Sequence, residues 1–174
     1  MSDELKKALE GCGAILYGDF TLASGKKSRY YIDIKRATTD PKVLGLIAEK
    51  MAERIKGDEF QRIAGVVLGS VPLAVALSLR TGIPFVMVRR EKKDHGTGRL
   101  IEGQLNPGEK VLVVEDVITS AGSAVYAVET LRQAGASVST VLSVVDREEG
   151  GREAMGKLDV EMRSLITASK ILGK

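Results

Sequence analysis

The strongest constraint on the fold is a series of short, uncharged apolar segments that alternate with helical segments between residues 62 and 145. Aliphatic runs of roughly four to eight residues without polar alternation are typical of strands buried on both faces, as in parallel sheets. Parallel strands need crossover connections, which the intervening helices provide. We therefore predict an α/β fold with a mainly parallel, Rossmann-like sheet flanked by helices.

Turn and capping signals place the individual elements. Strands are expected over 62–68, 85–88, 110–114 and 137–145, and helices over 41–55, 72–80 and 123–134. These are preceded by a helix ending before Gly13 and by extended segments over 15–34, with turns at Gly18-Asp19 and Ser24-Gly25. The length suits one domain, in which we expect residues 1–40 to form a small N-terminal hood and residues 41–174 the core.

Composition argues against several classes of protein. A net charge of +3 is too small to indicate nucleic-acid binding, and the single Cys12 suits a reducing compartment. The uncharged stretch over 63–79 is interrupted by Gly69, Ser70 and Pro72, so it is interpreted as a strand, a turn and a helix rather than a membrane span. The charged N-terminus lacks the apolar core of a signal peptide. We expect a cytoplasmic protein that binds neither membranes nor nucleic acid.

The clearest chemical signal is the segment V-L-V-V-E-D-V-I-T-S-A-G-S over 111–123, where a predicted strand leads into a short loop and a helix. Ligands of open α/β sheets bind beyond the carboxyl ends of the strands. Loop hydroxyls, loop amides and a helix N-terminus can hold a phosphate, whereas Glu115 and Asp116 suit ribose hydroxyls or a metal. No Walker loop or GxGxxG is present, so a sugar phosphate is favoured. The alternative is a plain connection capped by Ser123.

A second signal is the basic segment R-R-E-K-K-D-H-G-T-G-R over 89–99, which contains His95, the single histidine. The polar stretch around it is too long for a simple connection, and its glycines favour no single conformation. Loops of this kind often close over a substrate. A cationic lid beside a phosphate site indicates a polyanionic substrate, pyrophosphate in particular. The alternative is a solvated, charged loop.

Two weaker signals accompany these. Arg147 follows the last predicted strand at the same edge of the sheet, where a guanidinium can bind a carboxylate, although an ordinary surface salt bridge is the alternative. The polar segment over 20–28 either lies over a base or is a simple hairpin turn.

Together, these segments resemble the phosphoribosyltransferases, and within them the orotate branch. Residues 111–123 resemble the family's phosphoribosyl-pyrophosphate (PRPP) motif, and R-R-E-K-K-D-H-G resembles the catalytic loop of the orotate branch. F-T-L-A-S-G-K-K-S-R-Y-Y-I-D resembles the segment over the orotate ring, and V-V-D-R the segment whose arginine meets the orotate carboxylate. The resemblance spans residues 20–147 and implies the type I phosphoribosyltransferase fold.

The resemblance also implies a reaction: ribose 5-phosphate passes from PRPP to orotate, giving orotidine 5′-monophosphate and pyrophosphate in pyrimidine synthesis. Mg²⁺ would be held mainly by PRPP, with no dedicated protein ligands. Lys93 and His95 would be catalytic, acting on the leaving pyrophosphate, and Thr119 and Arg147 would bind orotate. The implied PRPP-binding residues are Arg89, Arg90, Lys93, His95, Glu115, Asp116, Val117, Ile118, Thr119, Ser120, Ala121, Gly122 and Ser123. A homodimer is implied, in which Arg89, Lys93 and His95 reach the neighbour's site while Arg90 serves its own.

The sequence departs from the family pattern at three places. Ala23 stands where many members have a lysine, the turn around Ser70 lacks a common Tyr-Lys pair, and Arg90 replaces the commoner lysine. Pyrophosphate contacts near Ser70 must therefore come from the backbone or from other residues. Two other functions remain open. A purine phosphoribosyltransferase would not need Arg147, because purines lack a carboxylate, and a PRPP-sensing regulator would not need the cationic lid.

Overall fold

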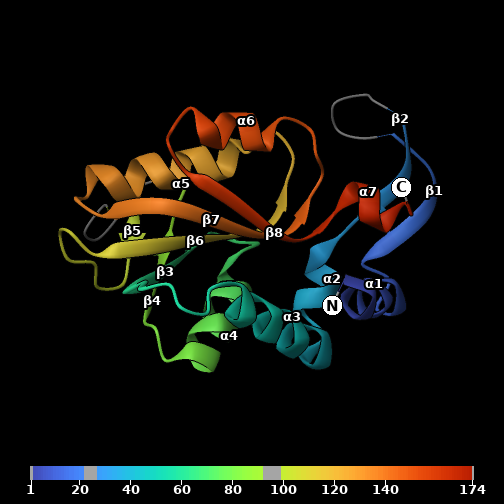
Figure 1. The fold of residues 1–174 in the computed structure, drawn as a ribbon, viewed down its shortest axis with the longest axis horizontal. Helices are drawn as coiled ribbons and strands as arrows, with labels where there is room; N and C mark the ends of the chain where they lie inside the picture. The colour runs from blue at the N-terminus through green and yellow to red at the C-terminus, as the bar shows by residue number, and fades with distance from the viewer. Residues whose placement is uncertain (1, 22–26, 92–98, 174) are drawn as a thin grey trace.

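The computed structural model describes residues 2–21, 27–91 and 99–173, and Figure 1 shows them as a central sheet between helices with a small hairpin at one end. The strands are β1 (Ile15–Thr21), β2 (Lys27–Ile32), β3 (Arg62–Val66), β4 (Phe85–Val88), β5 (Ile101–Glu102), β6 (Lys110–Ile118), β7 (Ser137–Asp146) and β8 (Glu161–Thr167). The helices are α1 (Ser2–Gly11), α2 (Ile34–Thr38), α3 (Pro41–Arg54), α4 (Val71–Thr81), α5 (Gly122–Gln133), α6 (Gly151–Gly156) and α7 (Ala168–Ile171).

The main sheet confirms the predicted α/β architecture. Its strand order is β5-β4-β3-β6-β7-β8, and every pair is parallel except β4 with the two-residue β5. Helices α4, α5 and α6 connect successive parallel strands, as crossovers must. The carboxyl ends of β3, β4, β6 and β7 consequently lie at one edge of the sheet.

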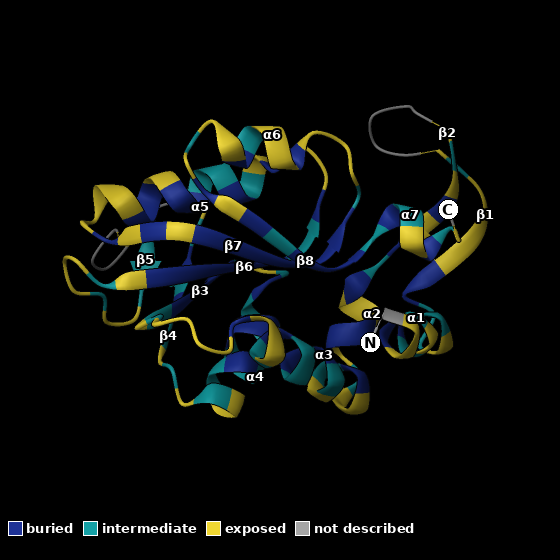
Figure 2. Ribbon diagram, in the orientation of Figure 1, coloured by how far each residue is buried: buried dark blue, intermediate teal, exposed yellow. Residues whose placement is uncertain are grey.

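Two apolar layers enclose the sheet, and Figure 2 shows its central strands as almost continuously buried. Successive strand residues face opposite sides, so Leu112 and Val114 join the core shared with α3 and α4, whereas Val111 and Val113 join the core shared with α5. This double coverage explains why the strands are continuous aliphatic runs.

The N-terminal part of the chain is a helix and a hairpin beside α7 (Figure 1). The α1 side chains Leu5 and Leu9 are buried in the same core as α3. Strand β1 pairs antiparallel with β2, and the pairing register shifts between Tyr17 and Phe20. The predicted turn at Gly18-Asp19 is therefore wrong: these residues form an irregularity within the strand. The predicted turn at Ser24-Gly25 lies outside the described residues.

Capping residues set two of the predicted helix boundaries. The Asp40 carboxylate accepts hydrogen bonds from the backbone N–H groups of Lys42 and Val43 at the start of α3. Gly82 ends α4 in the left-handed conformation, with a φ of 76°. Among the described residues, no helix is both long and apolar enough to cross a membrane.

Candidate active site

The acid pair lies within β6 rather than in the loop that follows it. The sequence predicts the end of this strand at Val114, but β6 continues to Ile118, and Val117 and Ile118 pair with β7. Glu115 and Asp116 are consecutive strand residues, so their side chains leave opposite faces of the sheet. The two carboxylates therefore have different surroundings.

Glu115 is buried, with 4% of its surface exposed. One carboxylate oxygen, Oε2, accepts a hydrogen bond of 2.5 Å from the Ser70 hydroxyl. The other, Oε1, is buried and has no partner among the described residues. Burial raises the pKa of Glu115 from 4.5 to about 7, against the opposing effect of the Ser70 hydrogen bond. This carboxyl group can therefore bind or release a proton near neutral pH.

Asp116 is half-buried and is therefore the more accessible of the two acids. Its Oδ1 accepts a hydrogen bond of 2.8 Å from the backbone N–H of Val117. The turn after β3 lies directly against it: a Cβ on Gly69 would be 2.8 Å from Asp116 Oδ2. Only glycine leaves this carboxylate undisturbed.

The loop after β6 presents hydroxyls and a helix N-terminus. Thr119 and Ser120 are exposed, and Ala121 precedes α5 in the left-handed conformation, with a φ of 65°. The alternative interpretation, in which Ser123 caps the helix, is wrong because the N-cap position is Ala121 and no side chain caps it. The first N–H groups of α5 are thus left without a capping side chain, an arrangement that suits an anion.

Residues at the end of β4 contact this loop. The Arg90 guanidinium donates a hydrogen bond to Ser123 Oγ, and the Tyr126 hydroxyl on α5 donates to the carbonyl of Arg89 at 2.9 Å. The first residues of the predicted lid are therefore attached to α5, the helix that follows this loop. Lys93 and His95 lie outside the described residues.

Arg147 lies at the end of β7, next to the loop after β6. Its backbone N–H donates to the Ile118 carbonyl at 2.9 Å. Its guanidinium lies 5.0 Å from the ring centre of Tyr30 in β2 and donates through Nε to Glu149 at 2.9 Å. The side chain is only 9% exposed, so the salt bridge with the more exposed Glu149 is accompanied by burial against the hairpin. Arg147 connects the sheet edge to the hairpin.

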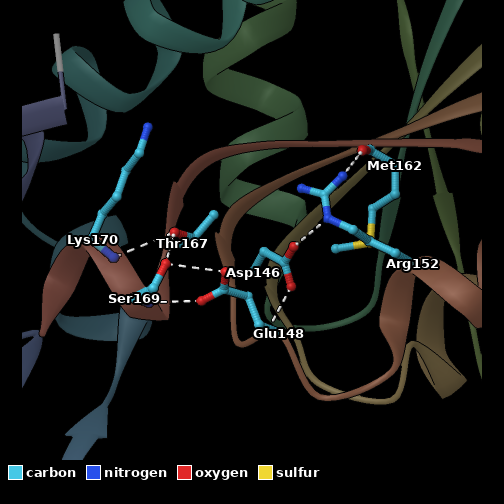
Figure 3. A network of polar contacts seen from close by, with 7 residues as sticks. All are labelled: Asp146, Glu148, Arg152, Met162, Thr167, Ser169 and Lys170. Atoms are coloured by element: carbon cyan, nitrogen blue, oxygen red, sulfur yellow. Dashed lines mark hydrogen bonds and ion pairs between the residues drawn. The ribbon is translucent and has the colours of Figure 1, made fainter. Parts of the chain in front are cut away.

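The segment around Arg147 is fixed on both sides by the network in Figure 3. The fully buried Asp146 accepts a hydrogen bond from Arg152 Nε at 2.9 Å, and Arg152 also donates to the Met162 carbonyl. Glu148 accepts hydrogen bonds from the backbone and hydroxyl of Ser169, at 2.7 and 3.1 Å. Because Arg147 lies between these two anchors, its backbone position is well defined.

The structure adds residues that the sequence patterns did not reveal. Ser70 and Tyr126 bond to predicted site residues, and Tyr30, which lies in the segment that resembles the cover of the orotate ring, stacks on another. Ser70 could have been found from the sequence, because it follows a predicted buried strand and therefore lies at the edge of the sheet where ligands bind. Nothing in the local sequence distinguishes Tyr126, and the resemblance of residues 20–33 does not single out Tyr30 within that segment.

Carboxylates are the side chains here with affinity for a hard metal ion. Within residues 2–21, 27–91 and 99–173, no group of three or more His, Cys, Asp or Glu side chains is arranged to hold a metal.

Comparison with known proteins identifies relatives along nearly the whole chain. The family model for the phosphoribosyl transferase domain matches residues 35–171. The orotate phosphoribosyltransferase of Methanosarcina mazei is 53% identical over 169 residues, which cover 97% of this chain and 90% of that protein. The crystal structure of orotate phosphoribosyltransferase from Aeropyrum pernix matches with a TM-score of 0.87 and 37% identity, over 97% of this chain and 96% of that one. The Mycobacterium tuberculosis enzyme in complex with PRPP matches with a TM-score of 0.82 and 31% identity, over 98% of each chain.

The raised pKa of Glu115 predicts a pH-dependent stability that Glu115→Gln abolishes. Between pH 4.5 and about 7 the unfolded chain releases this proton while the folded protein keeps it. The free energy of unfolding of the wild type should therefore fall across this range relative to the Gln variant, by up to roughly 3 kcal/mol. Urea titrations at a series of pH values measure the difference. Glu129→Gln, on the exposed surface of α5, is the control, and parallel wild-type and Glu115→Gln curves would contradict the prediction.

Proposed function

The chain belongs to the phosphoribosyltransferase family, in its orotate branch, and on that premise we propose that it transfers ribose 5-phosphate from PRPP to orotate. The products are orotidine 5′-monophosphate and pyrophosphate. The observation that carries the proposal is the convergence at one sheet edge of the acid pair of β6, the hydroxyl loop that follows it and Arg147. These groups match the three parts of the reaction: ribose, phosphate and an anionic base.

The 5′-phosphate of PRPP binds in the loop over 119–123. The hydroxyls of Thr119, Ser120 and Ser123, the backbone of Ala121 and Gly122, and the N-terminus of α5 are its donors. The Arg90 guanidinium, bonded to Ser123, adds a positive charge beside the loop. Glu115 and Asp116 accept hydrogen bonds from the ribose hydroxyls, and the backbone of Val117 and Ile118 completes this wall of the site.

Orotate binds between Thr119 and Arg147, with its carboxylate on the guanidinium. Glu149 accepts the hydrogen bond from Nε of Arg147, and among the described residues the two terminal nitrogens remain to form a fork with a carboxylate. Tyr30 of the hairpin stacks on the Arg147 guanidinium, so the hairpin lies next to the proposed orotate site. This contact supports the role of residues 1–40 as a hood over the base and of residues 41–174 as the PRPP-binding core.

Mg²⁺ is the cofactor, bound mainly through oxygens of PRPP. The residues at the site are compatible with this role. The acid pair orients the ribose hydroxyls of PRPP, and hydroxyl oxygens are ligands of the hard type that Mg²⁺ prefers. When bound, Mg²⁺ neutralises negative charge on the pyrophosphate. No side chain of this chain is assigned as a direct ligand.

Catalysis depends on placing positive charge against the leaving pyrophosphate as the ribosyl C1′ develops oxocarbenium character. Lys93 stabilises that leaving group, and His95 donates a proton or a charged hydrogen bond to it. The enzyme works as a homodimer in the cytoplasm, with Arg89, Lys93 and His95 contributed to the neighbour's site and Arg90 to its own. The hydrogen bond from Tyr126 to the Arg89 carbonyl holds the start of the lid against α5 of the same chain.

The first test is the loss of orotate absorbance with purified protein, PRPP and Mg²⁺. Conversion of orotate is expected, with none when Mg²⁺ is removed by a chelator. Adenine, hypoxanthine and uracil are offered separately as competing bases. Turnover of a purine instead of orotate would overturn the orotate assignment, and PRPP binding without turnover of any base would favour the regulator.

Gly69→Ala should weaken PRPP binding without destabilising the fold. The new Cβ would displace the Asp116 carboxylate, which can rotate at little cost to stability but then loses its position for ribose. We expect the KM for PRPP to rise about tenfold. Gly45→Ala on α3 has no atom within 4 Å of its new Cβ and is the control, expected to leave KM unchanged. Equal KM values for both variants would contradict the role of Asp116.

Lys93→Ala should lower kcat by at least about a hundredfold while changing the KM for orotate little, because it removes charge that acts on the leaving group. Steady-state kinetics of the variant measure both values.

A complementation experiment tests whether Lys93 acts in the active site of the neighbouring protomer. Lys93→Ala and Arg147→Ala protomers are mixed after mild denaturation and refolding. Each mixed dimer should regain one intact site of its two. Because random pairing makes about half of the dimers mixed, the preparation should show about a quarter of wild-type activity. No recovery would mean that Lys93 acts in its own subunit.

A further inference from the structure

Ser70 occupies a helix-capping position but does not cap the helix. It is the N-cap residue of α4, where serine usually accepts a hydrogen bond from a backbone N–H of the first turn. Its hydroxyl makes no such bond. The residue is 1% exposed, so burial of this polar side chain requires another explanation.

The Ser70 hydroxyl instead forms a hydrogen bond with Glu115, the buried residue of the acid pair. It donates to Glu115 Oε2, and no other side chain in the described part of the chain is recorded bonding that carboxylate. The backbone geometry makes this contact possible: a Cβ on Gly65 in β3 would be 2.8 Å from the Ser70 carbonyl oxygen. The absence of a side chain at position 65 lets the turn after β3 approach the sheet closely enough for Ser70 to reach β6.

We propose that Ser70 is a positioning residue that holds the Glu115 carboxylate in the orientation in which it meets the ribose hydroxyls of PRPP. The inference rests on the proposed function, because it assigns the acid pair to ribose. It also identifies what the turn contributes here in the absence of the Tyr-Lys pair: a serine that acts on ribose recognition through Glu115, rather than a side chain that reaches pyrophosphate.

Two charged groups act on Glu115 besides Ser70. The Asp116 carboxylate disfavours ionisation of Glu115, whereas the Arg90 guanidinium favours it. The hydrogen bond from Ser70 favours the ionised form as well. Loss of the hydroxyl should therefore do two things together: free the carboxylate to rotate, and raise the pH at which it ionises.

The test compares Ser70→Ala, Ser70→Thr and Ser164→Ala in steady-state kinetics from pH 5.5 to 9. Ser70→Ala should raise the KM for PRPP about tenfold, leave the KM for orotate nearly unchanged, and shift the acidic limb of kcat/KM for PRPP to higher pH. Ser70→Thr keeps the hydroxyl and should restore both properties. Ser164 is a buried serine of β8, two strands from β6, and its alanine variant controls for loss of a buried hydroxyl.

A double-mutant cycle with Glu115→Gln decides whether Ser70 acts through Glu115. In the Glu115→Gln background, Ser70→Ala should change the KM for PRPP less than twofold. A full tenfold loss in that background, or an unshifted pH profile in Ser70→Ala alone, would overturn the proposal. The cycle needs only the alanine variant, so it remains decisive if Ser70→Thr does not fold.

Calorimetric titration with PRPP and Mg²⁺, without orotate, separates this proposal from the proposed function. If the wild type binds PRPP but converts no orotate, the reaction assignment fails while the Ser70 comparison can still be made on affinity. If the wild type converts orotate and Ser70→Ala binds PRPP with wild-type affinity, the reaction stands and the positioning role of Ser70 is wrong.

Discussion

Strand β6 imposes the constraint on which the rest of the structure depends. It pairs with parallel neighbours along both edges, and apolar layers cover both its faces. The pairing with β3 ends at Val114, whereas the pairing with β7 continues through Glu115 to Ile118, so β7 holds the carboxyl end of β6 in register. The acid pair belongs to this rigid part, and the loop that starts at Thr119 leaves from it.

The fixed position of Glu115 in this strand lowers the stability of the folded protein when its carboxyl group is ionised. Glu115 follows four aliphatic residues of β6 and carries its carboxyl group into a buried position with one hydrogen-bonded oxygen. Removing a carboxylate from water destabilises its charged form, which is why the pKa of Glu115 rises to about 7. A group that weakens the fold at neutral pH is typical of a site whose arrangement serves binding rather than stability.

Two aromatic residues attach more peripheral parts to this rigid edge. Tyr30 stacks on the Arg147 guanidinium and so relates the hairpin to β7, although the hairpin is not a strand of the main sheet. Tyr126 bonds to the backbone at the start of the basic segment and relates it to α5. Both contacts join elements distant in the sequence, and both involve residues next to groups that we assign to substrate.

The sequence by itself determined the four central strands of the sheet, the helices α4 and α5 that connect them and the acid-hydroxyl motif, because these depend on local signals: uninterrupted aliphatic runs, Asp40 before Pro41, Gly82 after α4. Local signals were weaker for the two-residue β5 and the short α2, and the elements after Arg147 carried no pattern that was assigned. Only the tertiary structure decided that Glu115 is buried while Asp116 is accessible, and that Ser70, Tyr30 and Tyr126 contact site residues. Burial and side-chain partners depend on which strands and turns meet across the sheet edge, and the spacing of residues along one segment does not encode that.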